Sequence, residues 1–210
     1  MSEWHASAEM GDLDKIRFFL EHGHPVDQKD EDGLTAFQLA LKGGHVEVAR
    51  LLAKHGARTD RAAGFMSNGR DSAAMAQLLL ELGVSADELL DVAAKWCNAA
   101  TVAFILDAGA DLNRRDKKGE IPLYRATKNK SAAVLKLLLE RGADLTLLNE
   151  DGTHSLHFCA LWGDLERLKI LLDLGADPRQ LESDGATALG YARGPYSNAQ
   201  VVEELLARGA

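Results

Sequence analysis

DGLTAFQLALKGGHVEVARLLAKHGA, residues 32–57, decides how this chain folds. The Asp-Gly pair at its start is typical of a tight turn, and the threonine two residues later suits the beginning of a helix. Apolar residues then recur three and four positions apart in two successive segments, and each segment predicts a helix with one buried face. Gly44 separates the two segments and Gly56 ends the second, because glycine readily adopts the left-handed conformation that closes a helix. The stretch therefore predicts a turn followed by two short helices.

The same pattern recurs along the whole chain. A glycine ends an apolar helical segment at seven places, with spacings of 33, 27, 26, 33, 33 and 34 residues: Gly23, Gly56, Gly83, Gly109, Gly142, Gly175 and Gly209. A period of this length indicates stacked copies of one supersecondary unit. The predicted repeats 1 to 7 cover residues 1–27, 28–60, 61–86, 87–113, 114–146, 147–179 and 180–210.

A turn, a helix, a glycine and a second helix at a 33-residue period resemble the ankyrin repeat. The resemblance covers the chain, and it is carried by residues 32–40 and 44–52 and by the linker sequences at residues 109–113 and 142–145. It implies an all-α repeat solenoid, a single domain over residues 1–210 in which helix-turn-helix units stack and the turns project as short β-hairpin fingers. It also implies a concave face, formed by fingers and first helices, that binds other proteins.

Repeats 3, 4 and 7 depart from the pattern. In repeat 4, Gly83 is followed almost at once by residues 85–88, a capping-box sequence, so no room remains for a finger. In repeat 3, residues 59–68 must hold both the linker and the first helix. Two interpretations stay open: drift in a tolerant loop, or a notch that admits a segment of a partner. In repeat 7, Pro195 predicts an early helix end and places Tyr196 in a bulge.

Composition narrows the class of protein. Apolar residues make up 46% and charged residues 27%, which is ordinary for a soluble domain. No leader or membrane-spanning stretch is evident, so we expect a cytoplasmic protein that does not bind membranes. A net charge of −8 makes nucleic acid an unlikely partner. Cys97 and Cys159 lie too far apart in sequence for a disulfide framework or a metal knuckle, and we expect both thiols to be reduced and buried.

The seven histidines are the obvious candidates for catalysis. Three of them take positions where the resemblance implies a structural role: His5, His45 and His157. His154 stands where other repeats carry a capping threonine, and we expect it to substitute as a cap. His22 and His24 lack an evident third ligand for a metal. No nucleophile, base and acid form a suggestive order, so we expect no enzyme, no cofactor and no metal.

The repeat register points to candidate binding residues. The last two residues of each first helix should lie on the expected binding face, and several are large and apolar, which is unusual for a free surface. The predicted partner-binding residues at these positions are Met10, Lys95, Trp96, Lys128, Leu161 and Trp162. Tyr196 falls near the matching place in repeat 7, and the finger of repeat 2 adds Glu31, Asp32 and Leu34. The same register places Asn129 on this face, whereas Phe18, Phe19 and Phe104 are predicted to lie in the core. The alternative is that each tryptophan packs flat on a neighbouring repeat.

Charge suggests a second mode of binding. Residues 114–146 hold nine Lys and Arg against four acids, and Lys117 and Lys118 sit at the tip of the repeat 5 finger. We expect a non-enzymatic protein-protein interaction module, monomeric when free, that acts as a stand-alone adaptor or inhibitor and binds a folded partner through its concave face. The alternative is recognition of a linear acidic or phosphorylated peptide through the basic repeat 5 finger.

Overall fold

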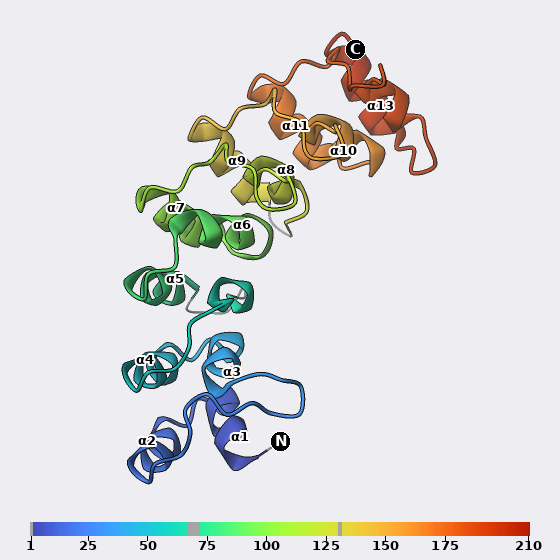
Figure 1. Ribbon diagram of the computed structural model, residues 1–210. Coiled ribbons are helices and arrows are strands. Elements are labelled where there is room, and N and C mark those ends of the chain that lie inside the picture. Colours follow the sequence, from blue (N-terminus) through green and yellow to red (C-terminus); the bar gives the residue numbers. More distant parts are fainter. Residues whose placement is uncertain (1, 67–71, 130–131) are drawn as a thin grey trace. The chain divides into compact units, whose positions relative to one another are not determined.

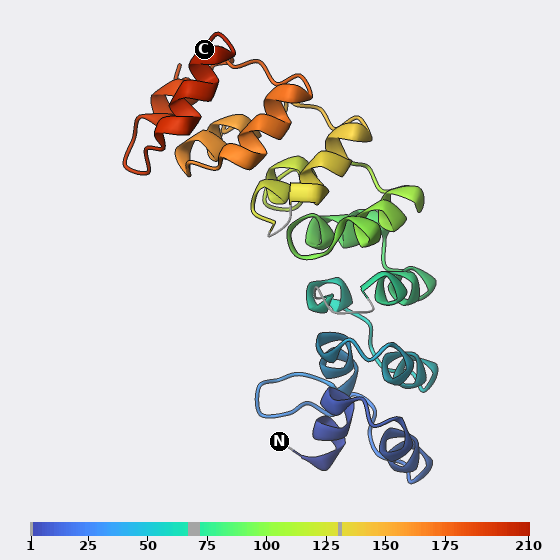
Figure 2. The same ribbon diagram turned by 180° about the vertical axis from the view of Figure 1, so that it is seen from behind.

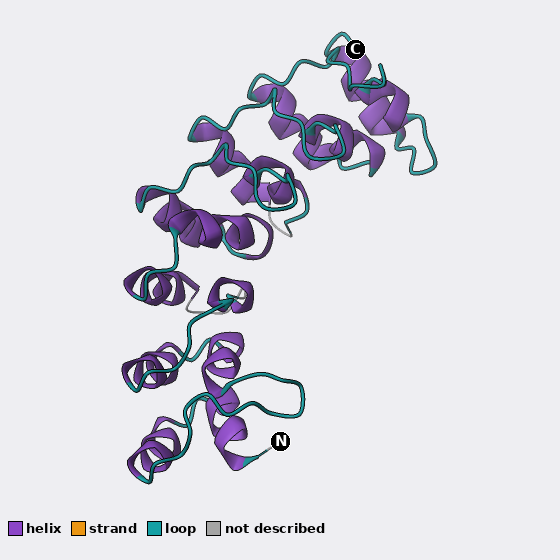
Figure 3. Ribbon diagram, in the orientation of Figure 1, coloured by secondary structure: helices purple, strands orange, loops and turns teal. Residues whose placement is uncertain are grey.

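The computed structural model describes residues 2–66, 72–129 and 132–210. Helices joined by loops make up these residues, and no strand is present among them (Figure 3). The predicted all-α repeat solenoid is therefore confirmed. The fingers, however, are turns rather than β-hairpins. In the described ranges, only isolated bridges pair their flanks, at Lys29 with Thr35 and at Leu181 with Thr187.

The chain divides into two compact units, and the first covers Met1–Ala93. First helices pack on first helices there, as α1 does on α3 and α3 on η1, while the second helices pack in the order α2, α4 and α5 (Figure 1). The elements of this unit are α1 (Glu3–Met10), α2 (Leu13–Glu21), α3 (Ala36–Gly43), α4 (Val46–Lys54), the 3-10 helix η1 (Ala62–Phe65), α5 (Ser72–Glu81) and most of α6 (Ala86–Trp96).

The second compact unit covers Ala94–Ala210. Helix α10 packs on α8 and α12, while α9 packs on α7 and α11, and α11 packs on α13 (Figure 2). Its helices after α6 are α7 (Ala99–Asp107), α8 (Pro122–Thr127), α9 (Ala132–Glu140), α10 (Ser155–Leu161), α11 (Leu165–Asp173), α12 (Ala188–Ala192) and α13 (Ala199–Ala207). The repeat boundaries given above and the single domain stay predictions.

Local hydrogen bonds explain where the helices begin and how the fingers turn. Thr35 and Gln38 form a reciprocal capping box at the start of α3. In the finger of repeat 2, the Asp30 carboxylate accepts hydrogen bonds from the backbone N–H groups of Asp32 and Leu34. Asp116 does the same for the repeat 5 finger, where it accepts from the second and fourth residues after it. These side chains hold the two turns, and in repeat 2 the isolated bridge between Lys29 and Thr35 adds to them.

The shortened repeats behave largely as expected. Helix α6 begins at Ala86, directly after the turn at Gly83, and the Ser85 hydroxyl accepts a hydrogen bond of 3.2 Å from the Glu88 N–H. Repeat 4 therefore has no finger, as predicted. In repeat 3, the first helix is reduced to the single turn η1, and the end of the 59–68 segment lies outside the described residues. In repeat 7, α12 ends before Pro195, and Tyr196 lies in the following loop, as predicted.

One predicted core residue is exposed. Phe18 has an exposed fraction of 56%, and Phe19 and Phe104 are half-buried. Ile16 is the buried residue of α2, and a helix turns about 100° per residue, so Phe18, two positions later, points away from the buried side. Its ring rests on the His22 ring instead, with 4.1 Å between the centroids. The placement of Phe18 in the core was wrong.

Candidate protein-binding surface

A run of contacting side chains crosses three successive repeats of the second unit. The Lys128 ammonium lies 4.3 Å from the centre of the Tyr124 ring and 5.7 Å from that of Phe158. The Tyr124 and Phe158 rings meet edge to face at 5.1 Å, and Phe158 lies 6.1 Å from Trp162. Trp162 in turn stacks on Tyr196, with centroids 4.7 Å apart and planes inclined by 25°. We call these five residues the aromatic ladder.

The ladder runs from the interior to solvent. Tyr124 is buried, and burial raises the pKa of its hydroxyl to about 12. Phe158 is half-buried, while Trp162 and Tyr196 have exposed fractions of 52% and 55%. Aromatic rings that stack offset or edge to face stabilise one another, so the exposed pair is held in place before any partner arrives. Such a pre-ordered pair loses little conformational entropy on binding.

Sequence spacing and one glycine bring the outer pair together. Phe158 and Trp162 are four residues apart at the end of α10, so their rings share a helix face. The loop that carries Tyr196 is tied to the same helix end by Asn198, whose side-chain amide donates a 2.9 Å hydrogen bond to the Gly163 carbonyl. A Cβ on Gly163 would lie 3.0 Å from Asn198 and 3.1 Å from the Tyr196 carbonyl oxygen. A glycine is therefore needed for this close approach.

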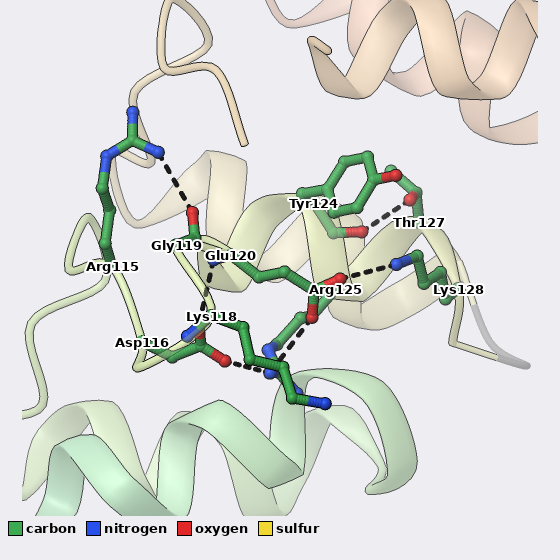
Figure 4. Close-up of polar contacts among 9 residues, drawn as sticks. All are labelled: Arg115, Asp116, Lys118, Gly119, Glu120, Tyr124, Arg125, Thr127 and Lys128. Atoms are coloured by element: carbon green, nitrogen blue, oxygen red, sulfur yellow. Dashed lines mark hydrogen bonds and ion pairs between the residues drawn. The ribbon is translucent and has the colours of Figure 1, made fainter. Parts of the chain in front are cut away.

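An ion-pair network supports the inner end of the ladder (Figure 4). The Arg125 guanidinium donates to the Asp116 carboxylate and lies 3.1 Å from Glu120, which also accepts a 2.7 Å hydrogen bond from Lys128. The Asp116 side chain is 7% exposed and that of Arg125 is 14% exposed. Burial alone would raise the pKa of Asp116, but the backbone N–H donors of Lys118 and Glu120 and the Arg125 charge outweigh it and lower that pKa.

We call the cation-rich residues 114–146 the basic band, and the network changes its interpretation. Lys128 is half-buried and engaged with Glu120 and two rings, so it is a structural part of the ladder and not a free docking cation. Arg141 pairs with Asp107 at 2.7 Å, and Lys136 lies 3.7 Å from Glu140. Lys130 lies outside the described residues. Lys117 and Lys118 at the finger tip are exposed, and within the described ranges their ammonium groups form no hydrogen bond or ion pair.

The other predicted binding residues fall into separate groups. Trp96 is 51% exposed, with the Lys95 ammonium 4.4 Å above its ring, and Met10 in the first unit is 80% exposed. Leu161 is half-buried beside the ladder. The placement of Asn129 on the surface was wrong, because its amide is buried and donates 3.0 Å hydrogen bonds to two carbonyl oxygens at the end of α6. On the repeat 2 finger, Glu31 and Asp32 are exposed and Leu34 is half-buried.

Sequence reasoning missed two members of the ladder. Tyr124 and Phe158 are each four residues before a predicted site residue, Lys128 and Trp162 respectively. That spacing places both members of each pair on one helix face, and it was the signal that could have found them. One side of the Trp162 ring packs on Tyr196 of the neighbouring repeat, as the packing alternative expects. About half of the side chain nevertheless remains exposed.

Two histidine rings form hydrogen bonds between neighbouring repeats. The His5 ring accepts a hydrogen bond from Ser2 and donates one of 2.9 Å to the Gln28 carbonyl, while His45 donates one of 2.9 Å to the Glu9 carbonyl. The structural roles of both are confirmed. The expected cap at His154 was wrong, because its ring makes no cap hydrogen bond. The backbone N–H of His154 instead donates a 3.3 Å hydrogen bond to the Glu182 carboxylate.

Glu182 and His157 form a buried polar cluster between α10 and the repeat 7 finger. The Tyr191 hydroxyl donates a 2.8 Å hydrogen bond to Glu182, and the His157 ring lies 3.7 Å from the same carboxylate. Neither ring nitrogen of His157 makes a well-formed hydrogen bond within the described residues, although backbone groups of Gln180 and Ala186 lie near enough to favour the charged ring. Burial lowers the pKa of His157 to about 4, with a further contribution from the nearby His154, whereas burial raises the pKa of Glu182.

We expect acid to destabilise this cluster. His157 titrates at about 4 in the folded chain and at 6.5 when unperturbed, so the unfolded chain binds more protons and stability falls as the pH drops from 6.5 towards 4. The lowered pKa of His154 acts in the same direction. The raised pKa of Glu182, increased further by Asp184, acts in the opposite direction and offsets part of the loss. The His157 shift is the largest of the three, so the expected net effect of acid is a loss of stability.

Urea unfolding at pH 7 and pH 4.5 measures this effect. His157→Asn should flatten the difference between the two pH values, because it removes the main titrating group. Glu182→Gln should enlarge the difference, because it removes the opposing one. Equal pH dependence in the wild type and the His157→Asn variant would show that the cluster does not control acid stability.

Two kinds of group bear on catalytic chemistry: clusters of metal ligands and cysteine thiols. No group of three or more His, Cys, Asp or Glu side chains within them is placed to hold a metal ion. Cys97 and Cys159 are buried free thiols, and burial raises the pKa of Cys97 to about 11 and that of Cys159 as well. Both are therefore poor nucleophiles at neutral pH. No helix within the described ranges has the length and apolar character needed to cross a bilayer.

Stacked helix pairs with projecting turns and an exposed aromatic pair define a repeat solenoid of the kind that binds proteins. Residues 90–181 and 123–210 match a family model described as ankyrin repeats (3 copies), and residues 4–53 match one described as ankyrin repeats (many copies). The chain belongs to the ankyrin-repeat family. Ankyrin repeats generally mediate protein-protein interactions, and the fold is typically non-enzymatic.

The chain is also similar to individual proteins. The solved ankyrin repeat domain of human ASB11 superposes with a TM-score of 0.80 at 23% identity, over 100% of this chain and 99% of that one. An L-asparaginase from Dirofilaria immitis is 28% identical over 138 residues, which are 60% of this chain and 23% of that protein. A transient receptor potential cation channel subfamily A member 1 homolog from Caenorhabditis elegans is 39% identical over 46 residues, 22% of this chain and 4% of that protein. The chain therefore spans a quarter or less of the length of the L-asparaginase and of the channel homolog.

Proposed function

We propose that this chain is a non-catalytic adaptor or inhibitor that binds a folded partner protein through the exposed end of its aromatic ladder. The stacked and half-exposed pair of Trp162 and Tyr196 carries the proposal. Tryptophan and tyrosine dominate the residues on which binding energy concentrates in protein interfaces. A monomeric free state, a concave binding face and a cytoplasmic location belong to the same proposal.

The ladder suits a folded partner because it is rigid. The Trp162 ring is held between Phe158 and Tyr196, and the inner end is anchored by Lys128 and its ion pairs. A rigid, half-exposed aromatic surface favours a partner whose own surface is pre-formed, since little reorganisation is then needed on either side. Trp96, with Lys95 above its ring, offers a second exposed aromatic in the same unit.

Affinity capture from source cells tests this function. The wild type and a Trp162→Ala variant serve as baits, and a Leu206→Ala variant is the matched control because Leu206 is also an exposed apolar residue of the second unit. A partner retained by the wild type and the control but lost by Trp162→Ala supports the proposal. A partner captured equally by all three baits would exclude the ladder as the binding site.

The finger tip of repeat 5 favours a second candidate function. Lys117 and Lys118 are exposed on a turn held by Asp116, whereas other cations of the basic band are engaged with carboxylates. Two adjacent ammonium groups at such a tip could pair with a linear acidic or phosphorylated peptide. Binding that survives when the partner is cut down to a short peptide favours this candidate over the folded partner.

We expect the double change Lys117→Glu and Lys118→Glu to slow association with an acidic partner about tenfold at low salt and to flatten its salt dependence. The reason is that exposed charges at the edge of an interface mainly steer the encounter. Stability should stay within about 0.5 kcal/mol, because both side chains are exposed. Stopped-flow association rates at two salt concentrations measure the effect. Unchanged rates at low salt would show that Lys117 and Lys118 do not steer association and contribute only to solubility.

A further inference from the structure

A cavity of about 510 Å³ lies beside the finger of repeat 2, in the first unit. The finger and the start of α3 form one wall, from Asp32 to Gln38, and the segment that leads from repeat 2 into the short helix of repeat 3 forms the other, from Arg58 to Phe65. This cavity occupies the side of the finger on which a finger of repeat 3 would stand if that repeat had one.

Neighbouring fingers in the second unit show what normally fills such a space. A Cβ built on Gly119 of the repeat 5 finger would lie 2.8 Å from the Glu150 side chain of the next finger. One on Gly152 would lie 2.8 Å from the Ser183 hydroxyl, again on the next finger. The corresponding Gly33 of repeat 2 meets nothing within 4 Å among the described residues. The fingers of repeats 6 and 7 therefore cover the glycine of the finger before them, whereas Gly33 has no such cover, and neither has Gly185 of the last finger.

The linker around the cavity keeps its normal connection between repeats. The Asp27 carboxylate accepts a 2.9 Å hydrogen bond from the Arg58 N–H, just as Asn113 accepts one of 2.9 Å from the Asp144 N–H between repeats 4 and 5. Three residues later, Arg61 has a φ of 63°, and of the described residues it is the only non-glycine with a positive φ. A strained residue of this kind persists only where its surroundings hold it, and such residues cluster at binding sites.

We propose that the cavity is a docking site for a tight polar turn of a partner protein, which takes the place of the missing repeat 3 finger and covers Gly33. Three cations and three carboxylates line it, so its charge is balanced, and Leu34 and Phe65 add apolar surface. This lining suits a turn of mixed polarity, like the fingers of this chain, better than a strongly charged peptide. The site is separate from the aromatic ladder and does not depend on it.

A cyclic peptide with the sequence of the repeat 6 finger, residues 147–154, is the probe. In ¹⁵N NMR titrations of the full chain, the Gly33 and Leu34 amide signals should shift, with a dissociation constant on the order of 1 mM. A linear peptide of the same composition in scrambled order should bind at least about fivefold more weakly, because it is not pre-formed as a turn. Absence of shifts at Gly33 and Leu34 up to about 5 mM peptide, or equal binding of the scrambled peptide, would overturn the proposal.

Gly64 provides the blocking variant. It lines the cavity, its φ is ordinary, and a Cβ there would meet nothing within 4 Å, so Gly64→Trp can fill the space without straining the fold. We expect at least a tenfold loss of peptide binding, while Ala74→Trp on the exposed face of α5 leaves binding unchanged. If Gly64→Trp lowers the melting temperature, the smaller Gly64→Gln variant replaces it. Full binding by folded Gly64 variants would show that the peptide does not occupy the cavity.

Discussion

Replacing Trp162 with alanine is expected to weaken binding of a folded partner about thirtyfold, which corresponds to about 2 kcal/mol. The ring offers its free half to a partner and is already oriented by its stack on Tyr196. Removal of the indole takes away contact area and also releases Tyr196, so both members of the exposed pair lose their arrangement. Tyr196→Ala should therefore reduce affinity in the same direction, by about fivefold to tenfold.

Two measurements on each variant separate binding from packing. Affinity is measured by titration calorimetry and stability by thermal unfolding, with Leu206→Ala as the matched exposed apolar control. The ladder hypothesis expects a large loss of affinity and a small loss of stability at Trp162, and the same for Trp96→Ala if that ring also contacts the partner. A lower melting temperature with full affinity in the folded fraction would instead support the packing alternative.

Arg125→Met is expected to destabilise the second unit by about 3 kcal/mol. The Asp116 carboxylate is 7% exposed, and Arg125 is its cationic partner together with two backbone donors. Without the guanidinium, a buried negative charge remains next to Glu120, and two like charges then face each other in a poorly hydrated site. The repeat 5 finger should loosen, and the melting temperature should fall by about 10 °C.

The chain itself suggests the compensating change. In the repeat 6 finger, the equivalent position is Asn149, whose side-chain oxygen accepts a hydrogen bond of 2.8 Å from the Thr153 N–H without carrying a charge. Asp116→Asn in the Arg125→Met background should therefore recover about half of the lost stability or more, since the turn is kept and the unpaired charge is removed. Lys136→Met is the control for an exposed ion pair and should cost less than about 1 kcal/mol. Equal losses for Arg125→Met and Lys136→Met would contradict the structural role of the network.

The sequence by itself determined the repeat architecture. Glycines at a regular period, capping residues such as Thr35 and apolar residues three and four positions apart all act within a few residues of one another. Their hydrogen bonds and helix faces are local, so a reader of the sequence can place them without knowing the fold. For the same reason the missing finger of repeat 4 and the early end of α12, before Pro195, were predictable.

The tertiary structure decided which side chains became surface and which became support. Lys128 and Asn129 follow the register of exposed positions, yet the first is held by Glu120 and two rings, and the second is buried against the end of α6, more than thirty residues earlier. The stack of Trp162 on Tyr196 and the uncovered side of Gly33 likewise depend on segments that meet only when repeats pack. Contacts between residues about one repeat apart depend on how closely helices and loops approach, and local periodicity carries no information about that distance.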